Sequence, residues 1–175
     1  KKDKAKIKEL YENKKWYTIR SILGNTWASW FFLIGARQRG KTFSVQDYVL
    51  NKFFNPKSKL YHVPFYWMRL TDIAVKTMLM NNGAKMFEPL LVKKYHLENI
   101  KVRGDTVYIG KLKLCYVWGL STAYNTKGAA IFDCDTFKGA NIIVDEIAWE
   151  KSQKKTMDPA YNLSLNIEAI CRNEY

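Results

Sequence analysis

The feature that most constrains this chain is a phosphate-loop pattern placed between an apolar run and a helical pattern. Residues 30–34 read Trp-Phe-Phe-Leu-Ile and predict a buried strand. The next residues fit G-x-x-x-x-G-K-[ST] at every fixed position, with Gly35, Gly40, Lys41 and Thr42. The two glycines let successive backbone N–H groups turn into one hollow, and the N-terminus of the following helix adds its own unpaired N–H groups. The pattern therefore predicts a binding site for nucleotide phosphates.

The residue types in this loop indicate a nucleoside triphosphate with magnesium. The Lys41 side chain can reach the β- and γ-phosphates, and the Thr42 hydroxyl is placed to bind Mg²⁺. A glycine-rich surface turn with an unrelated lysine is the alternative interpretation. We expect ATP and Mg²⁺ as the cofactors, and we expect the ATP-binding residues to be Gly35, Ala36, Arg37, Gln38, Arg39, Gly40, Lys41 and Thr42.

A second chemical motif is an acidic pair that follows an apolar run. Residues 142–144 read Ile-Ile-Val and predict a buried strand, and Asp145 and Glu146 come directly after it. Ligands of open α/β sheets bind at the carboxyl ends of the strands. We expect Asp145 to hold the Mg²⁺ of Mg-ATP, partly through water, and Glu146 to orient or deprotonate the attacking water. The alternative is that Asp145 caps a turn.

Arginines near the two motifs are candidates for stabilising the charge of a transferred γ-phosphate. Arg37 and Arg39 occupy variable positions of the loop, Arg69 ends a second predicted strand at the expected nucleotide edge, and Arg172 follows the last predicted helix. We assign Arg69 to the ATP-binding residues. Spacing alone favours surface or phosphate-screening roles over an arginine finger.

The cysteines and histidines argue against a disulfide framework and against a zinc site. Cys115, Cys134 and Cys171 are odd in number and far apart, which is typical of a reducing compartment. His62 and His96 are isolated in the sequence, so any metal is expected to be Mg²⁺ held by oxygen atoms. No apolar run is long enough to span a bilayer, and no signal peptide is expected.

The charge of the chain points to an anionic partner. Its 175 residues carry a formal net charge of +13, which attracts nucleic acid, anionic membrane or nucleotide. Charge alone does not choose among these, and a solvated basic surface is the alternative. Residues 1–23 form a basic amphipathic segment, which could also contact nucleic acid or a membrane. A helix that packs on the protein and exposes its charged face to solvent is the simpler interpretation.

Hydrophobic periodicity predicts an α/β fold. Proline, glycine and capping signals divide the chain into elements, among them a first-turn proline at Pro89 and a cap at Thr71–Asp72. Residues 119–139 predict a long functional loop. Predicted helices cover residues 1–23, 41–54, 72–80, a short segment from 89 and 159–171, and predicted strands cover residues 30–34, 63–69, 100–103, 106–109, 112–118 and 140–146.

Taken together, these motifs resemble the DNA-packaging ATPases of φ29-like phages, which are related to the large-terminase motors. The resemblance covers roughly residues 30–175, and a lactococcal relative of φ29 is a candidate source. It rests on the order of five features: Ile-Gly-Ala-Arg at 34–37, the strand ending in Arg69, the meander with Val-Arg-Gly at 102–104 and Gly-Lys-Leu at 110–112, Ile-Val-Asp-Glu at 143–146, and Cys-Arg-Asn-Glu at 171–174.

The resemblance implies a P-loop NTPase of the ASCE, RecA/terminase-like class. Such a fold has a central, mostly parallel sheet, helices on both faces and an antiparallel meander. In this interpretation residues 1–26 form a basic helical lead-in and residues 27–175 form the ATPase core. The chain stops before the family's coupling strand and its nuclease-like C-terminal domain.

The resemblance also implies a function and a set of partners. The protein would be a homopentameric ring at the portal vertex of a procapsid, pumping double-stranded DNA with ATP in the host cytoplasm, without a membrane partner. A packaging RNA is a further candidate partner. Lys41 and Glu146 would be catalytic, Arg172 would act in trans as an arginine finger, and Lys127 would be a second trans-acting basic residue.

Two other functions fit the same motifs. One is a helicase or another nucleic-acid-dependent NTPase of the same superfamily, which strand-separation assays would distinguish from a duplex translocase. The other is a nucleic-acid-binding module in which the nucleotide serves only as an assembly switch. That module would bind ATP without releasing phosphate.

Overall fold

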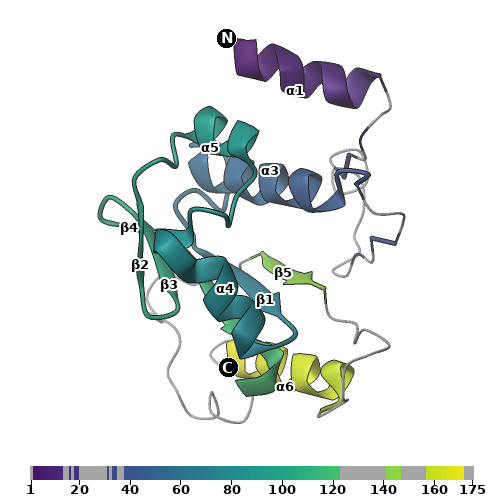
Figure 1. The fold of residues 1–175 in the computed structure, drawn as a ribbon, viewed down its shortest axis with the longest axis vertical. Coiled ribbons are helices and arrows are strands. Elements are labelled where there is room, and N and C mark those ends of the chain that lie inside the picture. Colours follow the sequence, from purple (N-terminus) through teal and green to yellow (C-terminus); the bar gives the residue numbers. More distant parts are fainter. Residues whose placement is uncertain are drawn as a thin grey trace. The chain divides into compact units, whose positions relative to one another are not determined.

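The fold is taken from a computed structural model, which describes residues 2–13, 16, 18–19, 31, 33–34, 38–122, 141–146 and 157–171 (Figure 1). The chain divides into two compact units, which we describe separately. The helical unit comprises Lys1–Tyr61 and Phe87–Asn99, and the sheet unit comprises His62–Met86 and Ile100–Tyr175.

Three helices form the described part of the helical unit. They are α1 (Lys2–Glu12), α3 (Lys41–Phe54) and α5 (Pro89–Tyr95). Helix α3 buries one face through residues at helical spacing, including Phe43, Leu50 and Phe53. Helix α5 begins at a first-turn proline and ends at Tyr95, because the left-handed backbone of the next residue, His96, stops the helix.

Partly buried polar contacts join α3 to both ends of α5. The backbone N–H of Glu88, just before α5, donates to the Gln46 side chain at 3.1 Å. At the other end of α5, Lys94 forms an ion pair with Asp47, and the Tyr95 hydroxyl donates to the same carboxylate at 2.7 Å. The Asp47 side chain is only 1% exposed, so its charge depends on these partners.

The sheet unit is built on a sheet of five strands in the order β2-β3-β4-β1-β5. Strand β1 lies between β4 and β5 and is parallel to both. The meander of β2, β3 and β4 is antiparallel and continues directly into the parallel part through β4. The strands are β1 (Phe65–Arg69), β2 (Ile100–Arg103), β3 (Thr106–Ile109), β4 (Leu112–Gly119) and β5 (Ile142–Asp145).

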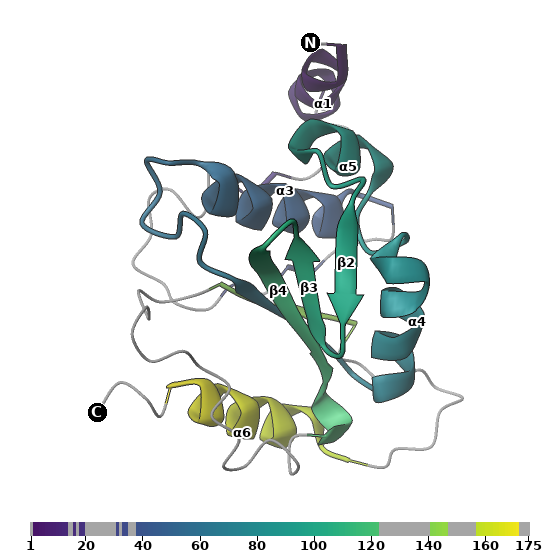
Figure 2. The same cartoon turned by 90° about the vertical axis from the view of Figure 1, so that its left-hand side faces the viewer.

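Helices of the sheet unit lie on both faces of this sheet (Figure 2). Helix α4 (Asp72–Gly83) lies on the face where Gly119 approaches Asp72 and where Gly83 approaches Val102. On the opposite face, Leu163 of helix α6 (Pro159–Cys171) packs against a buried cluster. The buried members of this cluster come from β1, β4 and the short 3₁₀ helix Leu120–Thr122, and are Tyr66, Met68, Trp118 and Leu120.

Many of the predicted elements are confirmed. The helix at 41–54, the Thr71 cap, the first-turn Pro89, the meander, the strand before Asp145 and the helix at 159–171 are all present. The Thr71 hydroxyl accepts from the backbone N–H of Ala74 at 3.2 Å. None of the described helices is both long and apolar enough to cross a membrane.

Two predictions about local structure are wrong. Helix α1 ends at Glu12 rather than near residue 23, because Trp16 packs against α3 instead of continuing the helical stripe. The described residues of the predicted strand at 30–34 pair with no strand, and Ile34 is 94% exposed, since an apolar run does not by itself supply a pairing partner. The described sheet combines a parallel part, in which β1 pairs with β4 and β5, with the predicted antiparallel meander.

We predict that Lys94→Ala destabilises the protein strongly. It would remove the Lys94 cation from a nearly inaccessible carboxylate, at a cost of about 3 kcal/mol. The control is Lys8→Ala, which removes an exposed ion pair with Glu12 and should cost about 0.5 kcal/mol or less. Urea unfolding measures both variants, and equal costs would contradict the role assigned to Asp47.

Candidate functional site

The described part of the phosphate loop runs into α3 as the sequence predicts. Gln38 and Gly40 have positive φ angles of 61° and 71°, and α3 begins at Lys41. The Gly40 carbonyl accepts from the Ser44 N–H at 2.9 Å, which is the first hydrogen bond of the helix. The Thr42 side chain is exposed at this end of α3. The backbone therefore reverses at Gly40 and presents the helix N-terminus.

An aromatic side chain from the N-terminal segment lies directly on this turn. A Cβ atom at Gly40 would be 2.9 Å from Cγ and Cδ2 of Trp16. The Trp16 ring also meets Phe43 edge-on, with ring centroids 4.6 Å apart. Slightly further along the chain, the Ile19 N–H donates to the Ser44 hydroxyl at 3.0 Å. The segment before the loop thus packs on the loop's last turn and on the first turn of α3.

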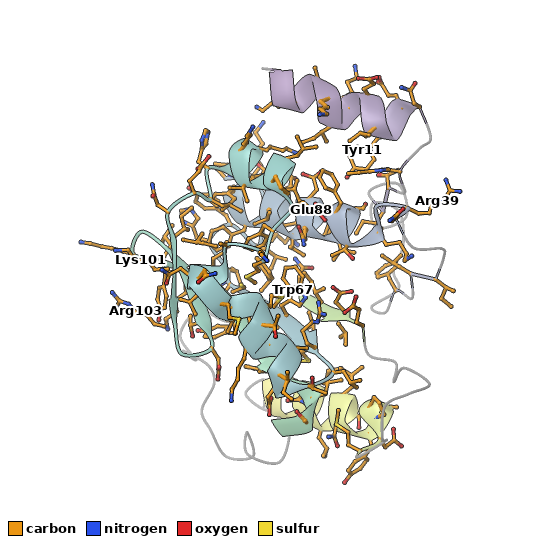
Figure 3. All side chains as sticks on the ribbon, in the orientation of Figure 1. Tyr11, Arg39, Trp67, Glu88, Lys101 and Arg103 are labelled. Atoms are coloured by element: carbon orange, nitrogen blue, oxygen red, sulfur yellow. The ribbon has the colours of Figure 1, made fainter. Side chains whose placement is uncertain are left out.

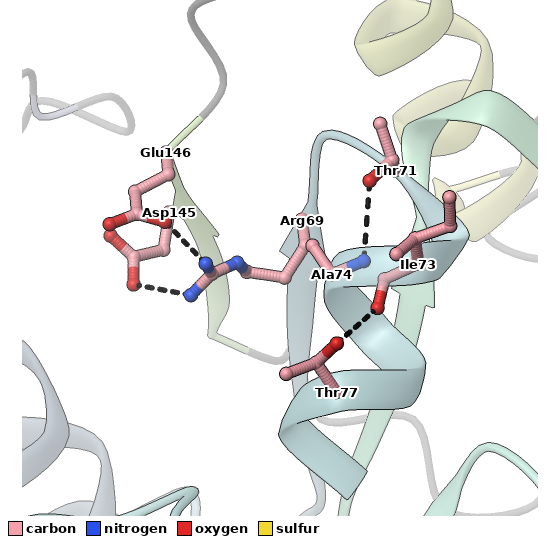
Figure 4. Close-up of polar contacts among 7 residues, drawn as sticks. All are labelled: Arg69, Thr71, Ile73, Ala74, Thr77, Asp145 and Glu146. Carbon is pink, nitrogen blue, oxygen red and sulfur yellow. Dashed lines mark hydrogen bonds and ion pairs between the residues drawn. The ribbon is translucent and has the colours of Figure 1, made fainter.

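The acidic pair meets an arginine at the carboxyl end of two parallel strands in the sheet unit (Figure 4). Arg69 ends β1 and lies in register with Asp145, the last residue of β5. Arg69 Nη1 is 3.3 Å from Asp145 Oδ2, and Arg69 Nη2 donates to Glu146 Oε2. We call Arg69, Asp145 and Glu146 the acidic-edge cluster.

The three members of the acidic-edge cluster differ in exposure. The side chains of Arg69 and Asp145 are 20% and 23% exposed, whereas Glu146 is 73% exposed. Glu146 has a φ of 54°, which turns the chain sharply as it leaves β5. A charge-assisted contact is screened less where both groups are partly desolvated, so water screens the contact of Arg69 with Asp145 less than its contact with Glu146.

The N-terminus of α4 is anchored beside the acidic-edge cluster. Gly119 is in register with Arg69, and a Cβ atom at this glycine would lie 2.3 Å from the Asp72 carboxylate. A residue without a side chain at 119 is therefore required where α4 begins. The Asp72 N–H donates to the Ser121 hydroxyl at 3.2 Å, which ties the helix start to the 3₁₀ helix that follows β4.

Burial removes one candidate nucleophile from the described residues. Cys115 is completely buried in β4, and this burial raises the pKa of its thiol well above the usual value. A buried, protonated thiol does not act as a nucleophile at neutral pH. The described part of the chain holds no group of three or more His, Cys, Asp and Glu side chains arranged to bind a metal.

The predicted site residues fall into three groups. Gln38, Arg39, Gly40, Lys41 and Thr42 lie in the helical unit, and the acidic-edge cluster lies in the sheet unit. Sequence analysis predicted a role for Arg69 but not its pairing with the acids. It did not single out Trp16, which lies far before the loop in the sequence and carries no signal of its contact with it. Five candidates lie outside the described residues: Gly35, Ala36, Arg37, Lys127 and Arg172.

Comparison with known proteins gives a likeness of fold. No protein-family model matches the chain, and no curated protein matches it. Its fold resembles that of a solved chain described as the Phi-28 gp11 DNA packaging motor, with a TM-score of 0.64 and 19% sequence identity. The match covers 89% of this chain and 46% of the solved chain, so this chain spans about half of that protein. The described α/β fold is therefore like that of a packaging motor.

We predict that Gly40→Ala costs about 2–4 kcal/mol of stability. Its left-handed backbone would add about 1–2 kcal/mol of strain, and the clash with Trp16 would add the remainder. Gly104→Ala is the matched control, because Gly104 has a φ of 58° with nothing within 4 Å of the added Cβ.

A double-mutant cycle separates strain from clash. Trp16→Ala removes the ring atoms at 2.9 Å and leaves only Cβ of residue 16, at 3.0 Å from the added methyl group. Part of the clash is therefore relieved, and the double variant should cost about 1 kcal/mol less than the sum of the single variants. Trp16→Ala with Gly104→Ala should be additive. Additive costs for the pair at 16 and 40, measured by urea unfolding, would show that Trp16 does not restrict the loop.

Proposed function

We propose that this chain is the ATP-hydrolysing part of a motor that moves double-stranded DNA into a phage procapsid. The observation that carries the proposal is the acidic-edge cluster, in which Asp145 and Glu146 leave a strand at the carboxyl edge of a parallel pair. The phosphate-loop sequence before α3 and the packaging-motor-like fold support it. A phosphate loop and an acidic pair at a strand end are expected together in one ATPase chain.

The proposed chemistry uses oxygen ligands for Mg²⁺. The donors fit this ion, because Mg²⁺ prefers carboxylate and hydroxyl oxygens, and Thr42 and Asp145 present one of each with access to solvent. We assign both residues to Mg²⁺ and Lys41 to the β- and γ-phosphates. The bound ion would neutralise charge on the transferred phosphoryl group.

Glu146 is the residue we assign to the attacking water. Its carboxylate is mostly exposed and follows Asp145 directly, so it is available to accept a proton from water. Arg69 is assigned as a positioning residue, because its guanidinium contacts both carboxylates. We propose that Arg172 acts in trans on the γ-phosphate of a neighbouring subunit, with Lys127 as a second trans-acting residue.

The proposal also includes transport of DNA. A motor must accept any sequence, so we expect it to contact DNA through phosphates rather than base edges. Assembly as a pentameric ring, docking to a portal and contact with a packaging RNA are proposed for the whole protein, of which this chain would be the ATPase part.

The first test is ATP hydrolysis by two variants. Lys41→Ala should abolish turnover, because the phosphates lose their cation. Glu146→Gln should retain ATP binding while kcat falls about a hundredfold or more, because the amide cannot accept the proton. Glu98→Gln, which changes an exposed acid in the helical unit, is the control. Phosphate release and equilibrium ATP binding are measured on the same samples.

The outcomes separate the candidate functions. Hydrolysis by Glu146→Gln at the unchanged rate would refute its assigned role. ATP binding by the unsubstituted protein without any phosphate release, with and without DNA, would favour the nucleotide-switched module. DNA-stimulated hydrolysis accompanied by strand separation would favour a helicase.

A second prediction concerns Arg69, whose guanidinium occupies carboxylate oxygens that Mg²⁺ would use. Arg69→Gln should lower the Mg²⁺ concentration for half-maximal hydrolysis by about fivefold, equivalent to about 1 kcal/mol. It should also lower kcat, because Glu146 loses its orienting contact. Lys76→Gln removes one exposed cation from the same unit and is the control. An unchanged Mg²⁺ requirement would contradict competition between Arg69 and the ion.

A further inference from the structure

One face of the β-meander carries two rows of polar and aromatic side chains. Register places Lys101 of β2, Tyr108 of β3 and Lys113 of β4 side by side. The adjacent row contains Arg103, Thr106 and Tyr116. Side chains in register share a face of a sheet. We call these six residues the meander face.

The three cations of the meander face are accessible to a partner. Lys101, Arg103 and Lys113 are exposed, and Figure 3 shows Lys101 and Arg103 projecting outward from β2. Lys111, in the turn before β4, is also exposed, whereas the acidic residue of the meander is Asp105. The meander therefore presents an excess of positive charge.

Two of these cations lie over tyrosine rings. The Arg103 guanidinium carbon is 5.6 Å from the centroid of the Tyr108 ring, and Lys113 Nζ is 6.0 Å from that of Tyr116. Tyr116 is also stacked on Tyr66 of β1, with ring centroids 5.3 Å apart and planes at 15°. The rings therefore restrict the positions of the cations, which reduces the entropy lost when an anion binds.

The same contacts decide which part of a nucleic acid fits this face. A base that stacks on a protein needs an open aromatic face. Here Arg103 covers Tyr108, and Lys113 and Tyr66 cover Tyr116. Phosphate groups need only cations at the surface, which the meander face supplies.

The opposite side of the meander holds this surface in place. Val107 and Cys115 are fully buried, and Ile100 and Val102 lie close to Gly83 at the end of α4. The cations are thus mounted on a packed sheet rather than on a loop. A rigid mount keeps their spacing when a partner binds.

We propose that the meander face binds the phosphate backbone of double-stranded DNA. The inference deepens the proposed function and rests on it for the identity of the polyanion. Its location is independent of the nucleotide chemistry, because the face lies on the side of the sheet opposite Arg69 and Asp145. The competing explanation is that cations on the edge strand β2 only prevent edge-to-edge aggregation.

The test compares two triple variants of equal charge. The first replaces Lys101, Arg103 and Lys113 with Gln, and the control replaces Lys57, Lys59 and Lys76, which are also exposed, with Gln. Binding of a duplex of arbitrary sequence is measured without nucleotide over a series of salt concentrations. Circular dichroism and thermal unfolding establish that both variants are folded.

We expect the meander-face variant to bind duplex DNA about tenfold more weakly or worse at low salt, and its salt slope should fall by about 2.7, or about 0.9 for each lost phosphate contact. The control variant should lose less than one unit of slope. Equal losses in both variants would show a non-specific effect of net charge and overturn the proposal. Aggregation of the first variant with unchanged DNA affinity would favour edge protection and also overturn it.

Two further arms distinguish the partner and the underlying function. A preference for single-stranded over duplex DNA that survives in the triple variant would assign nucleic-acid binding to another surface. Because binding is measured without ATP, a protein that fails to hydrolyse ATP but shows the expected loss would refute the proposed ATPase and keep the meander face. ATP hydrolysis by the protein, together with unchanged DNA binding by the meander-face variant, would keep the proposed ATPase and refute the meander face.

Discussion

The contact of Arg69 with Asp145 and Glu146 is the interaction on which the site in the sheet unit depends. Two adjacent carboxylates at a strand end repel each other, and one cation at the end of the neighbouring strand lowers that repulsion. The contact requires β1 and β5 to be parallel, adjacent and in register at their last residues. A shift of one residue would turn Arg69 to the other face of the sheet.

Local sequence signals predicted where helices and strands begin, whereas packing between distant segments determines which contacts they make. The helix start at Lys41, the Thr71 cap and the first-turn Pro89 follow from residues within one turn of the feature. The pairing of β1 with β4 and β5 joins segments far apart in the sequence, so the contact of Arg69 with the acids was not predictable from spacing. The end of α1 at Glu12 was missed for the same reason, because Trp16 leaves the helical stripe to pack on Phe43.

The sheet unit separates two kinds of chemistry by alternation along single strands. In β1, Arg69 points to the face that α4 covers and meets the acids there. Tyr66 points to the other face and supports Tyr116, which in turn lies under Lys113. A period of two residues thus lets one short strand serve both surfaces. Any displacement of β1 along its axis would disturb both the contact of Arg69 with the acids and the stacking of Tyr66 on Tyr116.

The contact between Trp16 and Gly40 affects how the molecule can be shortened. A protein that starts at residue 27, where sequence patterns place the beginning of the core, would lack the indole ring on the loop and the N–H that Ile19 gives to Ser44. Phe43, now 2% exposed, would be uncovered at the first turn of α3. Such a trimmed protein would gain an exposed apolar patch beside the turn at Gly40, and poor solubility would follow from the missing cover rather than from a defect in the core.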